Sequence, residues 1–310
     1  MVVPSYHQNK TPPKNTGRKQ EETKMAKDVY EIITERILEQ LDKGIVPWHK
    51  PWTGGHDGAY NYVTGRSYSI LNQFLLKHND AYLTFKQVQD LKGKVKKGAK
   101  SEIVTFWKVL PIEVEDQDGN KVKKNIPYLR YYTVFWIGDT EGIERKENAR
   151  TEILNPAEEA ENIVNLYMNS ENHPTLVRDK QSDRAYYTPT IDQVVVPMIE
   201  QFTDIAEYYS TLFHELTHST GYKTRLNRLT NTAFFGNEEY SKEELVAEIG
   251  AATLVNMAGL ETKSSFNNSA AYIESWSRAL RENKKMIVEA SSKANKAVNY
   301  ILGKTATEEA

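Results

Sequence analysis

Residues 213–221 read FHELTHSTG and place two histidines four positions apart, with a glutamate directly after the first. An α-helix turns by about 100° per residue, so His214 and His218 would lie one above the other on one helix face. Their imidazoles could then bind one metal ion, while Glu215 would reach a water on that ion without being a ligand. The spacing predicts a catalytic metal site with Glu215 as its general base.

The third ligand is expected to be an acid, because the chain has no cysteine and no histidine beyond His218. An extended HExxHxxGxxH site would need a further histidine where this sequence has Thr224. The segment EELVAEIGAA resembles the gluzincin pattern, in which one acid binds the metal and a later one orients a ligand histidine. We assign Glu244 to the metal and Glu248 to the orienting role, with Glu243 and Glu248 as alternative ligands.

Three protein ligands leave a fourth position for water, which is typical of catalytic metal sites. The ion, Zn²⁺ by preference and Mn²⁺ as the alternative, would acidify that water, and Glu215 would pass its proton to the leaving amine. An extended peptide could pair with the strands predicted in YYTPTIDQVVVP, residues 186–197. The second half is therefore predicted to be a zinc-dependent metallopeptidase. Two ordinary histidines on a buried helix are the alternative.

The segments around this motif have the apolar spacing of helices. Asp204 can cap a helix that carries the motif and ends at Gly221. Further helices are predicted over residues 157–169, 241–259 and 269–302, the last as one helix or two. These helices, together with the strand pair around Pro189, predict an α+β domain of the zincin-like, gluzincin type.

The first half also mixes helix and strand signals. Residues 28–44 predict an amphipathic helix that ends at Gly44. Residues 102–110 and 127–137 are rich in β-branched and aromatic side chains and flank a turn, which predicts an antiparallel hairpin. The aromatic residues that alternate along these strands, including Trp107 and Tyr131, are expected to lie in the core. The first half is thus predicted to be a second α+β domain.

A chain of 310 residues exceeds the usual size of a single core. We predict a disordered leader (1–27), a first domain (28–145), a linker (146–156) and a second domain (157–310). The absence of cysteine fits a reducing compartment, and no apolar run reaches membrane-spanning length. We therefore expect a cytoplasmic protein without a membrane partner.

Charge is distributed unevenly along the chain. Residues 1–150 hold 25 Lys+Arg against 19 Asp+Glu, whereas residues 151–310 hold 15 against 23. A basic half with interleaved aromatic residues is typical of single-stranded DNA binding, in which bases stack on rings and phosphates meet cations. The alternative is that the lysines form a solvated turn and the tryptophans fix the loop to the domain. The candidate DNA-binding residues are Trp48, Lys50, Trp52, Tyr62, Arg66, Tyr68, Lys94, Lys96 and Lys97.

The stretches PWHKPW, NYVTGRSYSILNQFLL, RAYYTPTIDQVVVP, YYSTLFHELTHSTGYKTRLNR and EELVAEIGAATL resemble the ArdC antirestriction family over about residues 28–300. The resemblance implies an N-terminal single-stranded-DNA-binding domain and a C-terminal zincin-like metallopeptidase domain. It also implies carriage by conjugative plasmids and other mobile elements, whose entering DNA the protein protects from restriction.

The family's metal-site pattern matches this sequence at His214, Glu215, His218 and Glu244. One departure is Tyr222, because members often have a histidine after the glycine. The expected partners are single-stranded DNA and an unidentified protein substrate. The alternative is a non-catalytic protein that coats single-stranded DNA and has a structural or vestigial metal site. A SprT-like protease for DNA crosslinks ranks lower, because that group uses a third histidine.

Overall fold

The computed structural model describes residues 28–49, 58–115, 121–146, 155–229, 238–260 and 270–304. The predicted leader lies outside these ranges, as do most of the predicted linker and the candidates Lys50 and Trp52. Among the described helices, none combines the length and hydropathy that crossing a bilayer requires.

The first half alternates short helices with strands. Its elements are α1 (Val29–Leu41), η1 (Pro47–His49), β1 (Tyr60–Asn61), α2 (Ile70–Leu75), β2 (Ala81–Leu83), α3 (Phe85–Asp90), β3 (Lys94–Val95), β4 (Glu102–Glu115), β5 (Lys121–Trp136), η2 (Ile137–Asp139) and β6 (Thr140–Glu141). Helix α1 ends at Leu41, and the chain turns away at Gly44, whose φ of 76° is the left-handed conformation that glycine adopts readily.

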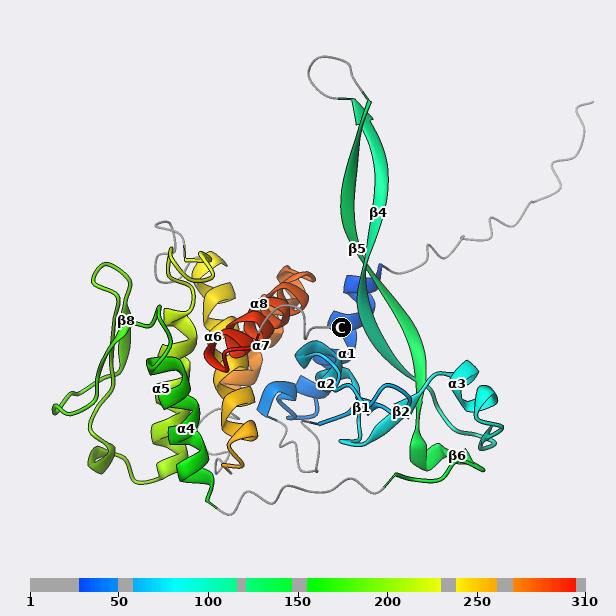
Figure 1. The fold of residues 1–310 in the computed structure, drawn as a ribbon, viewed down its shortest axis with the longest axis horizontal. Helices are drawn as coiled ribbons and strands as arrows, with labels where there is room; N and C mark the ends of the chain where they lie inside the picture. The colour runs from blue at the N-terminus through cyan, green and yellow to red at the C-terminus, as the bar shows by residue number, and fades with distance from the viewer. Residues whose placement is uncertain are drawn as a thin grey trace, which may run out of the picture.

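The second half is mainly helical. Its elements are α4 (Pro156–Met168), β7 (Thr175–Val177), β8 (Tyr186–Thr188), β9 (Gln193–Val195), η3 (Ile199–Gln201), α5 (Ile205–Ser219), α6 (Glu238–Met257), α7 (Ala270–Glu282) and α8 (Met286–Ile301). The helices lie beside a small sheet of order β7-β9-β8, in which β8 is an edge strand antiparallel to β9 (Figure 1). The α+β class is confirmed for both halves.

Helices α5 and α6 pack against each other closely. Helix α5 begins at Asp204, whose carboxylate accepts a hydrogen bond from the N–H of Ala206 at 2.9 Å. Its apolar side, with Leu212 and Leu216 fully buried, faces the core. At Gly250 of α6 a Cβ would lie 2.6 Å from Cγ2 of Thr217, so only glycine allows this approach. The helix with the two histidines is thereby held against the helix with the glutamates.

The predicted hairpin is present but is much longer than expected. Strands β4 and β5 stay paired from Glu102–Val134 out to Glu115–Lys121, and the outer part projects away from the rest of the molecule (Figure 1). The expectation that Trp107 and Tyr131 lie in the core is wrong, since they are 49% and 43% exposed. Alternation of apolar residues marks a face of a strand but does not show how far that face is covered: Leu129, opposite Trp107, is buried, whereas Trp107 itself is not.

The two halves share one hydrophobic core. Helices α1 and α2 and the turn η1 contribute to the same buried cluster as α6, α7 and α8. Thr34 of α1 donates a hydrogen bond to the carbonyl of Lys284 at 2.7 Å. The domain limits at 28–145 and 157–310 stay a prediction, but the elements on either side of the linker are packed together.

Candidate metal centre

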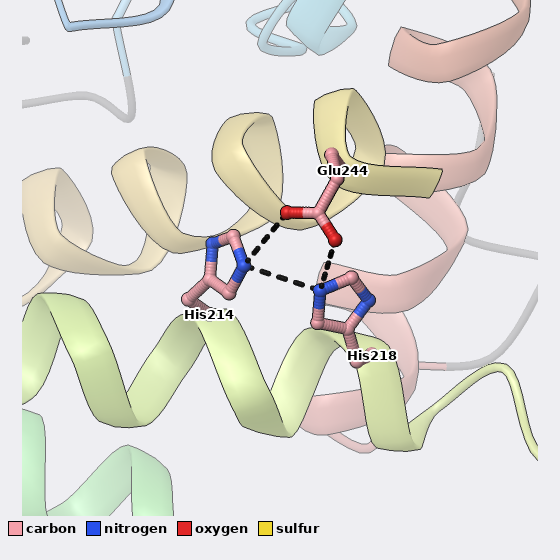
Figure 2. Close-up of side chains that lie close together, drawn as sticks. All are labelled: His214, His218 and Glu244. Atoms are coloured by element: carbon pink, nitrogen blue, oxygen red, sulfur yellow. Dashed lines mark hydrogen bonds and ion pairs between the residues drawn. The ribbon is translucent and has the colours of Figure 1, made fainter. Parts of the chain in front are cut away.

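Three side chains from α5 and α6 converge on one point (Figure 2). Nε2 of His214 lies 3.1 Å from Nε2 of His218. The carboxylate of Glu244 lies 3.5 Å from the first of these nitrogens and 3.6 Å from the second. The sequence-predicted ligands are thus brought together by two neighbouring helices.

The spacing of these atoms fits one metal ion. Tetrahedral coordination with bonds of about 2.0–2.2 Å places ligand atoms roughly 3.3–3.6 Å apart. The observed separations of 3.1–3.6 Å scatter around that value. Two imidazole nitrogens and one carboxylate oxygen form a donor set suited to Zn²⁺ and to other first-row divalent ions. One donor atom from each of His214, His218 and Glu244 lies within 4.8 Å of the other two.

The carboxylate of Glu244 and the imidazole of His214 each favour the charged form of the other. Burial alone would raise the pKa of the Glu244 carboxyl, but the hydrogen bond to His214, the two imidazoles and the hydroxyl of Tyr240 lower it. Burial would likewise lower the pKa of His214, but Glu244 and the neighbouring carboxylates raise it. Glu244 is therefore held as a carboxylate, the form that binds a metal.

Glu215 has a different environment from the ligands. Burial raises the pKa of its carboxyl and Glu244 adds to this, while the two histidines and the backbone N–H of Tyr187 act in the opposite direction. Tyr187 belongs to the edge strand β8, and its N–H donates to Glu215 of α5. Glu215 thus lies on the side of α5 that faces β8, with a carboxyl that takes up a proton more readily than usual.

Glu243 makes a hydrogen bond to His218, whereas Glu248 acts on His214 through its charge, and the orienting role of Glu248 stays a prediction. Oε1 of Glu243 lies 3.2 Å from Nδ1 of His218. Arg228 donates to the same carboxylate from Nε at 3.0 Å and from Nη2 at 2.9 Å. Despite burial, contact with His218 and Arg228 lowers the pKa of Glu243. Glu248 accepts a hydrogen bond from Tyr272 at 3.3 Å, because α7 covers that turn of α6.

Two residues of the site were missed in the sequence. Tyr240 donates to Glu244 and stands four positions before it, so the helical spacing could have revealed it. Arg228 follows α5 in a segment without periodicity and gave no such signal. The side chain of Arg225, which follows the same helix, is fully buried, and its Nη1 donates to Asp192 at 2.9 Å.

The structure contradicts the assignment of Trp48 as a base-stacking residue. Trp48 is 1% exposed, and its ring packs against Phe74 and Trp276. Its indole N–H donates to the hydroxyl of Tyr272 at 3.2 Å. The ring therefore belongs to the shared core, as in the alternative in which this tryptophan fixes the loop to the domain.

The other described DNA-binding candidates differ in exposure. Tyr62 is 8% exposed, and Nζ of Lys146 lies 4.5 Å from the centre of its ring. Tyr68 is partly buried and makes an edge contact with Tyr82. Four cations are exposed on the surface, and their role in DNA binding stays a prediction: Arg66, Lys94, Lys96 and Lys97.

Comparison with known proteins places these features in a family. Residues 27–135 match the model for the N-terminal domain of anti-restriction factor ArdC, and residues 169–293 match a zincin-like metallopeptidase model. Two DNA primases TraC of Escherichia coli are each 32% identical over 92% and 89% of this chain, which spans only 20% and 27% of their length. The uncharacterized protein y4eC of Sinorhizobium fredii is 29% identical over 88% of this chain and 91% of its own length.

Solved structures extend the likeness across both halves. The Mn(II)-bound crystal structure of the antirestriction protein ArdC from plasmid R388 is 31% identical with a TM-score of 0.66, over 89% of this chain and 97% of ArdC. The metal-free structure gives 32% identity and a TM-score of 0.65, over 88% and 96%. The ArdC N-terminal model matches the first half of the chain, and the zincin-like model matches the second half. The chain therefore belongs to the ArdC family of antirestriction proteins, with a zincin-like metallopeptidase domain as its second half.

Proposed function

We propose that this protein is a metal-dependent peptidase whose first half binds single-stranded DNA, and that it protects DNA entering a cell by conjugation from restriction. The convergence of His214, His218 and Glu244 beside Glu215 is the observation that carries the peptidase assignment. The antirestriction role is supported by the family, and the DNA-binding role by the basic, aromatic first half.

His214, His218 and Glu244 would hold one divalent ion, with Zn²⁺ as our first choice. When bound, the ion supplies polarisation of the scissile carbonyl and a lowered pKa for a water molecule. Glu243 and Arg228 keep the imidazole of His218 in its binding orientation, and Tyr240 does the same for Glu244. The protein side chains therefore fix the ligands before any substrate arrives.

Glu215 acts as the general base and then as the general acid. Its carboxylate accepts a proton as the water oxygen attacks the carbonyl carbon, and the same proton goes to the amide nitrogen as the C–N bond breaks. The raised pKa of its carboxyl makes Glu215 a better proton acceptor in the first transfer.

The edge strand β8 provides a place for the substrate. The backbone N–H of Tyr187 reaches Glu215, so the free edge of this strand faces the catalytic helix. An extended peptide pairing with that edge would bring one of its carbonyls next to Glu215. Asp192 stabilises the position of this strand. It accepts a hydrogen bond from the hydroxyl of Tyr187 at 2.8 Å and forms an ion pair with Arg225.

The test of the peptidase is Glu215→Gln in the full-length, metal-loaded protein, with fluorescently labelled casein as the probe. Cleavage should fall by about 10²–10⁴-fold while the metal content measured by mass spectrometry stays at one ion, because Glu215 is not a ligand. Full cleavage by the variant, or no cleavage by the parent with or without single-stranded DNA, would contradict the assignment. In the second case a non-catalytic DNA coat would be the better interpretation.

The DNA-binding half is tested separately by fluorescence anisotropy with a labelled thymidine oligomer and a duplex of equal length. We expect the single strand to bind more tightly and its affinity to fall steeply with salt, because counterions are released from the phosphates. Equal affinity for both DNAs, unaffected by salt, would contradict this part of the proposal and leave the peptidase assignment untouched.

A further inference from the structure

The two faces of the β4–β5 hairpin carry different side chains. In an antiparallel pair, directly opposite residues point to the same face, and successive residues alternate between faces. The register pairs Phe106 with Arg130 and Lys108 with Tyr128 on one face, and Trp107 with Leu129 on the other. We call the first of these the cationic face, and its residues are Phe106, Lys108, Lys124, Tyr128, Arg130 and Tyr132.

Charge separates the two faces sharply. Within the described part of the hairpin, the cationic face between the pairs Val104–Tyr132 and Val114–Val122 holds three cations and no carboxylate. On the opposite face Glu113 stands across from Lys123 and Glu115 across from Lys121, so positive and negative charges are matched there. Attraction for a polyanion is therefore expected on the cationic face alone.

Exposed aromatic rings lie among these cations. Phe106 and Tyr132 are each 37% exposed, and their ring centroids lie 5.4 Å apart. Further out on the same face, Leu110 and Ile126 are 49% and 40% exposed. Rings next to Lys and Arg side chains are what a surface for single-stranded nucleic acid requires, since bases stack on the rings and phosphates meet the cations.

Other partners fit this face less well. A second copy packed face to face would place Lys108, Lys124 and Arg130 against their own counterparts with no acid on either side, which is unfavourable. A duplex would satisfy the cations but would keep its bases stacked inside, so the rings would gain little. A single strand presents phosphates and base faces together.

We propose that single-stranded DNA binds along the cationic face of the β4–β5 hairpin, with phosphates at Lys108, Lys124 and Arg130 and bases stacked on Phe106 and Tyr132. The inference rests on the proposed DNA-binding function. It moves the contact surface from the loop around Trp48, where the ring is buried, to a hairpin that projects into solvent (Figure 1).

The test compares two double variants of the full-length protein that each remove one exposed ring and one cation from the same hairpin. Phe106→Ala with Arg130→Ala alters the cationic face, and Trp107→Ala with Lys123→Ala alters the opposite face. Both lose the same net charge. With a fluorescein-labelled 30-mer of thymidine, we expect the first variant to bind at least tenfold more weakly and the second to stay within threefold of the parent. The salt slope should fall by about 0.7 in the first variant only.

Each other result overturns the inference in a recognisable way. Equal losses in both variants would mean that total charge, and not one face, governs binding. Parent-like binding by the first variant would place the DNA elsewhere while the proposed function stands, whereas a parent that does not bind would defeat both. A parent dimer that becomes monomeric in the first variant by sedimentation would make this face an interface between copies. Circular dichroism melting shows whether both variants are folded.

Discussion

The metal centre and the β4–β5 hairpin hold their functional side chains in opposite ways. At the metal centre neighbouring side chains hold the candidate ligands in place: Glu243, itself bound by Arg228, contacts His218, and Tyr240 contacts Glu244. On the hairpin the register alone decides which side chains share a face, and most of the described residues of its outer part are exposed. Substitutions at the metal centre should therefore disturb chemistry, whereas those on the outer hairpin should leave folding nearly unchanged.

Trp48→Ala and Trp107→Ala test this contrast with the same substitution in the two settings. Trp48 is 1% exposed within the core shared by both halves, whereas Trp107 on the hairpin is 49% exposed. We expect Trp48→Ala to lower the free energy of unfolding by about 3–5 kcal/mol, because it leaves a large cavity. Trp107→Ala should cost less than about 1 kcal/mol. Urea denaturation followed by circular dichroism measures both.

Similar losses in these two variants would show that the hairpin is covered in solution. A folded Trp48→Ala protein should also bind single-stranded DNA as the parent does, since its ring is not available for stacking. Loss of DNA binding at concentrations where the variant is fully folded would restore the role that the sequence assigned to Trp48.

Glu243→Gln and Glu248→Gln compare the acid that the structure places on His218 with the acid that sequence spacing favoured. Removing an outer partner of a ligand histidine weakens metal binding by about 10–100-fold, or about 1.4–2.7 kcal/mol. We expect that loss for Glu243→Gln and less than about a threefold change for Glu248→Gln, which mainly meets Tyr272. Competition with a chromogenic chelator measures the affinities. A larger loss for Glu248→Gln would reverse the assignment.

Local periodicity was enough to select the three side chains that the structure brings together. The spacing of His214 and His218 requires only a helix, and the alternatives for the acid lay within five residues of one another on a second helix. The sequence could not show that Gly250 lets α5 and α6 approach closely. Nor could it show that Arg228 donates hydrogen bonds to Glu243. These contacts depend on packing between segments that are separate in the chain.

The aromatic residues show most clearly that the sequence alone does not predict which side chains are exposed. A tryptophan that follows a proline can stack on a base or fill a core, and Trp48 fills the core because Tyr272 and Trp276, over 200 positions later, cover it. Alternating aromatic residues in β4 and β5 predicted a buried face, but the strands run beyond the elements that could cover them. Exposure is a tertiary property in both cases.

The smallest effect is expected away from both regions, at Glu161 of α4. Arg178 donates to its carboxylate at 2.6 and 2.8 Å, and Tyr209 of α5 donates at 3.1 Å. The hydrogen bonds from Arg178 lower the pKa of this carboxyl in spite of partial burial. A lowered folded pKa contributes stability above the unfolded pKa, about 4.3, and that stability is lost as pH falls through the folded pKa.

Glu161→Gln should therefore reduce the free energy of unfolding by about 1 kcal/mol at pH 7, and the difference from the parent should shrink steadily below about pH 4.5. Urea denaturation across this pH range, with a chelator present so that metal release does not contribute, measures it. Glu274→Gln on α7 is the matched control, since its partner Arg278 and Glu274 itself are about 70% exposed, and it should change stability by less than about 0.5 kcal/mol throughout. A difference for Glu161→Gln that grew toward low pH would contradict the sign of the pKa shift, and with it the view that this ion pair stabilises the contact between α4 and α5.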